Sequence, residues 1–166
     1  MRYLLLGAIA LGAGAQAQVP AHGGVRLSRA IGIVESHVSG RAIEADVQKR
    51  GGRLVYEIDV VRGPILHRAL VDIQSGKLIS VTRPRLENWT LPWLDPERLR
   101  EGARAVPLAE RLELLEERNH GEVRDVDFAV EHGRGVFEIE FATAAGIGKV
   151  RIDGVSGKRL ELAESD

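Results

Sequence analysis

Two similar stretches decide the fold of this chain: Val71-Asp72-Ile73-Gln74-Ser75-Gly76-Lys77-Leu78 and Ile152-Asp153-Gly154-Val155-Ser156-Gly157-Lys158-Arg159. In each, the glycine permits the positive φ of a hairpin turn, and the serine suits the turn position before it. The aspartate can accept hydrogen bonds from N–H groups two or three residues further on. We therefore predict that both stretches are structural turns, formed by Asp72, Ser75, Gly76 and Lys77 and by Asp153, Ser156, Gly157 and Lys158. A Walker phosphate loop is excluded, because Ser or Thr would have to follow the lysine.

The similarity extends well beyond the turns. At an offset of 81 residues, Leu27–Ile79 aligns with Leu108–Leu160 without a gap, and 13 of the 53 aligned positions are identical. Roughly four identities would be expected by chance for this composition. The pattern indicates an internal duplication, with a period too long for a solenoid repeat.

Each copy has the pattern of a helix followed by strands. Leu27, Ile31, Val34 and Val38 form one apolar stripe at helical spacing, and we expect Gly40 to end this helix in a left-handed conformation, as Gly121 does in the second copy. Alternating apolar and polar residues then predict strands, the clearest being 54–60 and 136–141. On the outward face of these strands, paired carboxylates such as Glu57/Asp59 and Glu138/Glu140 are expected to be solvated.

The predicted fold is therefore α+β, with two tandem repeats that each pack one N-terminal helix on a three- to four-stranded antiparallel sheet. A unit of about 55 residues buries little surface alone, so we expect the two copies to pack together.

A segment of different composition, 83–105, separates the copies and contains Pro84, Pro92 and Pro96. Asp95-Pro96-Glu97 predicts the start of a short helix, with Asp95 as the N-cap. The two tryptophans, Trp89 and Trp93, either fold into the seam between the copies, which we favour, or contact a partner.

The first 17 residues have the pattern of an export signal. A basic Arg2 precedes an uncharged stretch too short to span a bilayer, and Ala15-Gln16-Ala17 fits a signal-peptidase site. We expect cleavage after Ala17 and a periplasmic or secreted protein. No second stretch approaches spanning length, so no stable membrane insertion is expected after cleavage.

Composition excludes several classes of protein. The chain has 166 residues, no cysteine and a formal net charge of −1, so disulfide scaffolds, cysteine nucleophiles and nucleic-acid binding are not expected. The five histidines form no metal-ligand spacing, and no G-x-S-x-G motif occurs. We predict no catalytic residues, no metal site and no cofactor.

With its leading helix and Val-aromatic-Glu-Ile strand, the Asp-x-x-Ser-Gly-Lys turn resembles the PepSY domain, found in propeptides of thermolysin-type metallopeptidases and in small exported bacterial proteins. The resemblance covers 25–82 and 106–163 as two copies. In the second copy Arg111 replaces Ala30, and the helix is far more charged.

The resemblance implies a non-enzymatic exported protein that binds a protein or peptide partner and modulates or inhibits a peptidase in the cell envelope. A free edge of an antiparallel sheet can accept an extended peptide as an added strand. The alternative is a periplasmic sensor or accessory protein of an envelope signalling system that binds a small ligand or metal.

Overall fold

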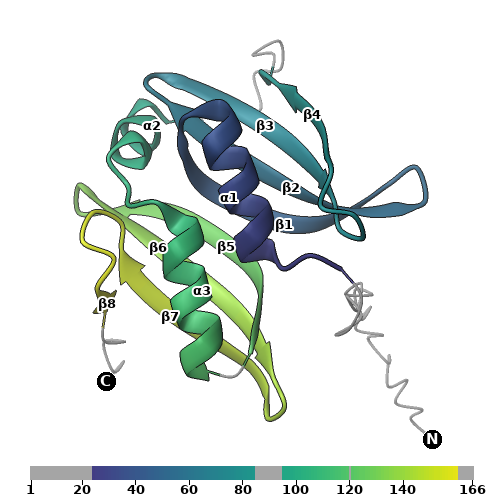
Figure 1. The fold of residues 1–166 in the computed structure, drawn as a ribbon. Helices are drawn as coiled ribbons and strands as arrows, with labels where there is room; N and C mark the ends of the chain where they lie inside the picture. The colour runs from purple at the N-terminus through teal and green to yellow at the C-terminus, as the bar shows by residue number, and fades with distance from the viewer. Residues whose placement is uncertain (1–23, 85–94, 120, 161–166) are drawn as a thin grey trace, which may run out of the picture.

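The strands of the protein form one antiparallel sheet in the computed structural model, which describes residues 24–84, 95–119 and 121–160 (Figure 1). The strand order across the sheet is β4-β3-β2-β1-β5-β6-β7-β8. The predicted signal segment 1–17 and both Trp89 and Trp93 lie outside the described residues. In chain order, the elements are α1 (Leu27–Val38), β1 (Arg41–Arg50), β2 (Arg53–Arg62), β3 (Ile65–Asp72), β4 (Leu78–Thr82), α2 (Pro96–Ala103), α3 (Leu108–Asn119), β5 (Glu122–Glu131), β6 (Arg134–Thr143), β7 (Gly146–Asp153) and β8 (Arg159–Leu160).

The elements of the second half follow those of the first at a constant offset. Helices α1 and α3 begin at residues 27 and 108, and strands β1 and β5 begin at residues 41 and 122, a difference of 81 in both cases. The irregularity in strand pairing repeats as well, between Ala42 and Glu44 in β1 and between Val123 and Asp125 in β5. The same order of elements, with a pairing irregularity at the same place, therefore occurs in both halves.

An α+β fold with antiparallel strands is confirmed, but the sheet differs from the prediction. We expected a separate three- to four-stranded sheet in each copy, whereas β1 and β5 join all the strands into one sheet. These two strands pair at Ala45 and Val126 and diverge on either side of that contact. The join removes two open sheet edges, which small sheets otherwise have to protect.

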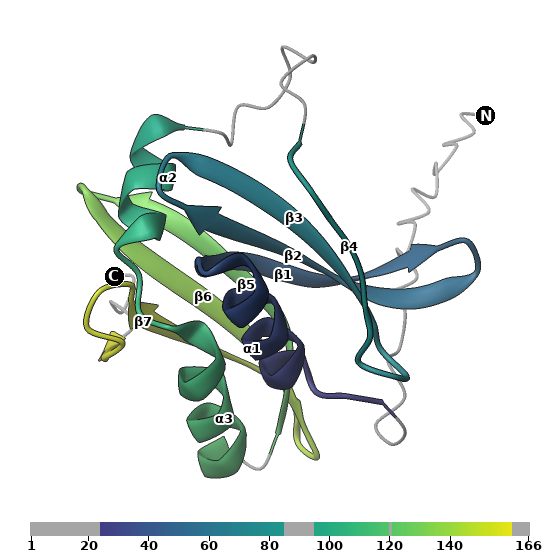
Figure 2. The ribbon, with the colours of Figure 1, turned by 45° about the horizontal axis from the view of Figure 1, so that its top comes forward.

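Helices α1 and α3 lie side by side on one face of the sheet (Figures 1 and 2). The predicted stripe of α1 is buried, with Leu27, Ile31 and Val34 each fully inaccessible to solvent. Beneath the helices, Phe128 and Phe137 pack with ring centroids 4.9 Å apart. Burial of each large apolar side chain contributes about 1.5–3 kcal/mol, so this layer is the main source of stability.

The end of α1 corrects one prediction about glycine. Ser39, not Gly40, takes the left-handed conformation, with φ of 54°. Gly40 is required for a close approach instead: a Cβ atom there would lie 2.6 Å from Val60 Cγ1 and 2.7 Å from the carbonyl oxygen of Val61. Gly121 has the same role, because its Cβ would lie 2.7 Å from the carbonyl oxygen of Ala142.

Helix α2 begins where the sequence pattern placed it. Pro96 is its first residue, and the Asp95 carboxylate accepts a hydrogen bond from the Glu97 N–H at 2.9 Å. In Figure 2 this helix lies beyond one end of α1, over the ends of the central strands. Among the described residues, no helix is long and apolar enough to cross a membrane.

Candidate functional site

The two Ser-Gly-Lys turns have the same internal hydrogen bonds. Asp72 Oδ1 accepts the N–H and the hydroxyl of Ser75, both at 2.8 Å, and Asp153 Oδ1 accepts those of Ser156, both at 2.7 Å. These hydrogen bonds, chiefly the one from the serine backbone N–H, hold the pKa of both aspartates below its usual value. The carboxylates are therefore committed to closing the turns.

The glycine of the first turn also touches the segment before α1. Gly76 and Gly157 have φ of 70° and 65°, and Gly76 packs against Val25. The Val25 N–H donates to the Ile73 carbonyl at 2.8 Å, so the turn fixes the entry to α1. Lys77 and Lys158 are exposed and have no hydrogen bond from their ammonium groups to described residues.

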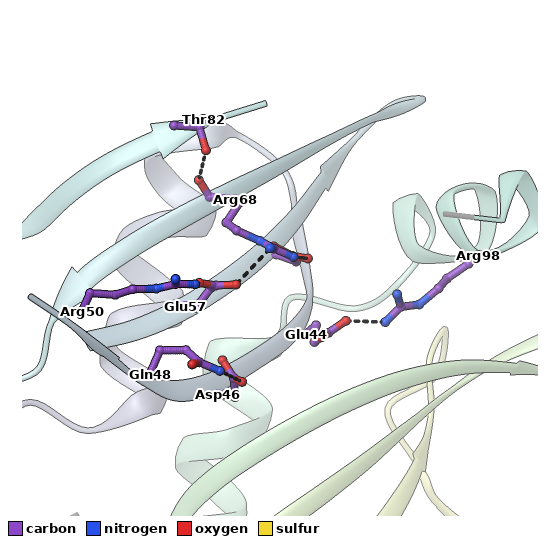
Figure 3. Close-up of polar contacts among 9 residues, drawn as sticks. Glu44, Asp46, Gln48, Arg50, Glu57, Arg68, Thr82 and Arg98 are labelled. Atoms are coloured by element: carbon purple, nitrogen blue, oxygen red, sulfur yellow. Dashed lines mark hydrogen bonds and ion pairs between the residues drawn. The ribbon is translucent and has the colours of Figure 1, made fainter. Parts of the chain in front are cut away.

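The face of the sheet opposite the helices carries a network of ion pairs around Arg68 (Figure 3). Its guanidinium donates two hydrogen bonds to Asp59, each 2.8 Å long, and lies 3.0 Å from Glu57, which also pairs with Arg50. We expected solvated carboxylates here, but Asp59 is only 3% exposed. Burial raises the pKa of Asp59, and the Arg68 hydrogen bonds oppose that rise.

The second half repeats this arrangement with a lysine. Lys149 Nζ lies 2.8 Å from Glu138 and 3.7 Å from Glu140, the residues equivalent to Glu57 and Asp59. Here the groups are more exposed, in keeping with the solvated face expected from the sequence. Both networks balance strand carboxylates with a cation from the neighbouring strand.

One carboxylate on the face of the sheet opposite the helices has no lysine or arginine paired with it among the described residues. Asp125 in β5 forms no hydrogen bond or ion pair with any residue that the structure describes. Burial raises the pKa of Asp125 to about 6, and the negative charges of Asp127, Asp46 and Glu140 add to the rise. This position was not recognised from the sequence, because only the pairing of β1 with β5 brings the acids of the two halves together.

A groove of about 1470 Å³ lies at one end of the helix-covered face, where the two halves meet. Tyr56 lines it, and the phenol donates a hydrogen bond to the Val25 carbonyl at 3.0 Å. The groove was also missed from the sequence, since its walls come from segments far apart in the chain. It is lined by Gly24, Val25, Arg26, Gly52, Arg53, Leu54, Tyr56, Asp72, Ile73, Gln74, Ser75, Glu116, Glu117, Gly121, Glu122, Arg124, Ala142, Thr143 and Ala144.

The described residues offer no evident centre for metal binding. No group of three or more His, Asp or Glu side chains in 24–84, 95–119 and 121–160 is placed to hold an ion. Of the histidines, His37, His67 and His132 lie in these ranges, in separate places, and His22 and His120 lie outside them. The concave groove and the unpaired Asp125 are thus the features that the fold itself does not use.

The comparisons with known proteins identify a domain in the first half. The family model described as "Peptidase propeptide and YPEB domain", PepSY, matches residues 26–82, which contain α1 and β1 to β4. The second predicted copy, 106–163, is not matched and stays a prediction. No curated protein matches the sequence.

A solved structure described as a "putative lipoprotein" from Clostridium difficile 630 is similar in outline, with a TM-score of 0.44 and 12% sequence identity. The similarity covers 86% of this chain and 94% of that one. The family match is confined to the unit that begins the described structure: residues 26–82 of this chain match the PepSY domain.

Proposed function

We propose that this protein is an exported, non-catalytic module that binds a protein or peptide partner and thereby modulates a peptidase in the cell envelope. The observation that carries the proposal is the PepSY match over residues 26–82, whose description names peptidase propeptides. The second unit is proposed to be a further, divergent copy of the same domain. Export rests on the sequence pattern of the first 17 residues.

The surroundings of the buried acids support a binding role rather than catalysis. Glu35 Oε1 accepts the Ala42 N–H at 3.0 Å, and Glu116 Oε1 accepts the Val123 N–H at 3.2 Å. Asp59 is held by Arg68. Each of these carboxylates is engaged in holding elements together. Glu116 also accepts the hydroxyl of Ser28 at 2.9 Å, but this serine is only 1% exposed and lies within the same buried contact.

Inhibition assays test the proposal directly. The chain beginning at Gln18 would be preincubated with a panel of thermolysin-type metallopeptidases, and the hydrolysis of a fluorogenic peptide followed over time. We expect concentration-dependent inhibition of at least one enzyme, with the inhibitor still intact by mass spectrometry. Heat-unfolded chain is the control, since an unfolded chain competes only as a substrate.

Two outcomes would contradict the proposal. The first is cleavage of the folded chain at the rate of the unfolded one, because it would then be an ordinary substrate. The second is tight binding of a metal or small ligand in calorimetry with no effect on any peptidase, which would favour the sensor alternative. A pull-down from periplasmic extract, scored for a peptidase or a sensor-kinase ectodomain, separates the same two hypotheses.

A further inference from the structure

Helix α2 occupies a place where both halves of the protein contact it. A Cβ atom on Gly102 would lie 2.8 Å from Ile43 Cγ2 and 3.4 Å from Val61 Cγ2, and Phe128 of the second half closes the other side at 3.8 Å. Leu99 of the same helix packs against the core. The helix is thus a short amphipathic segment that fills a groove between the halves.

One arginine secures α2 in that groove. Arg98 Nη2 donates to Glu44 Oε2 at 2.8 Å, and its Nε donates to the Phe128 carbonyl at 2.9 Å. The Arg98 side chain is only 12% exposed. It reaches from α2 to β1 and β5 where these strands diverge, and Figure 3 shows it meeting Glu44. A cation in this seam neutralises a carboxylate and satisfies a strand carbonyl together.

The 81-residue offset places an equivalent groove at the other end of the seam. The residues that follow α2 are held by a hydrogen bond from the Val106 N–H to the Gly154 carbonyl, 2.8 Å long. Its equivalent from Val25 to Ile73 is also 2.8 Å, and it borders the open groove of about 1470 Å³. Ala142, which lines this groove, is the equivalent of Val61.

The chain does not repeat the sequence of α2 before its first helix. The residues 81 positions before α2 are 15–22, Ala-Gln-Ala-Gln-Val-Pro-Ala-His, and they contain the cleavage site expected after Ala17. Gln18 stands in the place of Leu99, and Pro20 stands in an interior position, where proline disfavours a helix. The occupant of the open groove is therefore sought in another molecule.

The charges where the two halves meet indicate which kind of side chain the bound segment carries. Asp125 is the equivalent of Glu44, the carboxylate that Arg98 neutralises. It has no hydrogen-bonding or ion-pairing partner among described residues, and Asp127, Asp46 and Glu140 surround it with further negative charge. A positive side chain inserted here would gain from all four groups.

We propose that the open groove binds a short amphipathic helix of a partner protein in the manner of α2, with an arginine of that helix reaching beyond the residues that line the groove to Asp125, as Arg98 reaches Glu44. The partner helix presents a small residue toward Ala142, as α2 presents Gly102 toward Val61. This inference rests on the proposed function, because it locates the site at which the protein or peptide partner is bound.

The probe for a test is a synthetic amidated peptide with the sequence of residues 95–106, which carries the α2 pattern. It is titrated into the ¹⁵N-labelled chain beginning at Gln18, and amide shifts are followed by NMR. We expect saturable shifts at Gly52, Tyr56 and Thr143. Asp125→Asn should weaken binding about tenfold, the effect of losing about 1.4 kcal/mol, whereas Asp127→Asn, an exposed neighbour on the same strand whose charge is screened by solvent, should weaken it much less.

A double-mutant cycle ties the effect to one contact. When the arginine of the peptide equivalent to Arg98 is replaced by alanine, the Asp125→Asn variant should bind it as well as the original chain does, because the paired group is already gone. Ala142→Trp, which fills the groove without removing a charge, should also abolish binding. Thermal melts of each variant separate loss of the site from loss of the fold.

The proposal is overturned if the peptide does not bind, if shifts appear only around Ile43 and Val61, or if Asp127→Asn weakens binding as much as Asp125→Asn. It is also overturned if a chain beginning at Gly24 binds and the chain beginning at Gln18 does not, since the preceding residues would then be the occupant. Groove binding without any peptidase inhibition would contradict the proposed function alone. Inhibition that survives both Asp125→Asn and Ala142→Trp would contradict the groove alone.

Discussion

Glu35 and Glu116 join the two helices in opposite directions. Glu35, near the end of α1, accepts a hydrogen bond from the N–H of Leu108, the first residue of α3, at 3.3 Å. Glu116, near the end of α3, accepts one from the hydroxyl of Ser28, in the first turn of α1, at 2.9 Å. Each carboxylate also accepts the N–H of the strand after its own helix. The identity of these two residues in the repeat thus has a structural cause.

Replacing Glu35 by alanine should be strongly destabilising, because two buried amide N–H groups lose their acceptor. Each unsatisfied buried group costs about 1–3 kcal/mol, so we expect a loss of about 2–6 kcal/mol in the free energy of unfolding, measured by urea denaturation. Glu35→Gln keeps an acceptor oxygen and should be much milder. Equal losses in the two variants would show that the carboxylate charge, and not the hydrogen bonds, holds α3 in place.

Burial raises the pKa of both Glu35 and Glu116. A raised pKa in the folded protein means that the folded state holds its proton more tightly than the unfolded chain does. The stability contributed by these groups is therefore full below the unfolded pKa of about 4.5 and is lost as pH rises through the folded value. The Glu35→Gln and Glu116→Gln variants should each show a flatter dependence of unfolding free energy on pH above 4.5 than the original chain.

Asp125 makes the free energy of unfolding depend on pH in the same sense, over a range of pH that its own pKa defines. Its pKa is raised to about 6, chiefly by burial and then by neighbouring acids, so it destabilises the fold as pH rises from about 4 to above 6. Asp125→Asn should raise the free energy of unfolding at pH 7.5 by about 1 kcal/mol, a figure that allows for solvent screening of a half-buried group. The gain should disappear at pH 4. If Asp125→Asn binds the partner less well although its fold is more stable, the loss of binding cannot be due to unfolding.

Much of the local structure could be predicted because it depends on residues close in sequence. The apolar stripe beginning at Leu27 predicts α1, and the Asp95-Pro96-Glu97 pattern predicts the start of α2. The turn residues beginning at Asp72 form the hydrogen bonds that their types favour. These features depend on spacing and on backbone preferences, which the sequence displays directly.

The parts that could not be predicted depend on how distant segments meet. The join between Ala45 and Val126 makes one sheet of two, and no periodicity indicates which edge strands will pair. The burial of Asp59 depends on Arg68 from the next strand, so alternation alone predicted a solvated residue. The groove is likewise formed only when α3 and β6 meet the segment before α1.

Gly40 and Gly121 should be intolerant of even one added methyl group. In each case a Cβ atom would lie within 2.7 Å of a strand carbonyl oxygen, so the strand would have to shift. We expect Gly40→Ala and Gly121→Ala each to cost about 1–3 kcal/mol in denaturant unfolding. Gly32→Ala is the matched control within α1: its Cβ would lie 3.4 Å from Ala109 Cβ, and alanine is the better helix former by up to about 1 kcal/mol. A stabilised Gly40→Ala variant would contradict the close approach.

The two turn aspartates should respond to pH in the opposite sense from the helix glutamates. The Ser75 and Ser156 N–H groups lower the pKa of Asp72 and Asp153, so the stability that these aspartates contribute is present above the unfolded pKa of about 3.8 and is lost as pH falls through the folded value. Asp72→Ala should lower the melting temperature at pH 7 by a few degrees, with the difference from the original chain shrinking below pH 3. Asp72→Asn keeps a side-chain acceptor for the turn, so its melting temperature should lie between those of Asp72→Ala and the original chain. Residue 72 should then add little to the pH dependence of that temperature. Because Asp153 makes the same bonds, Asp153→Ala should match Asp72→Ala in size. An unequal pair would mean that one turn carries a role in addition to closing its hairpin, and inhibition assays on the two variants would locate it.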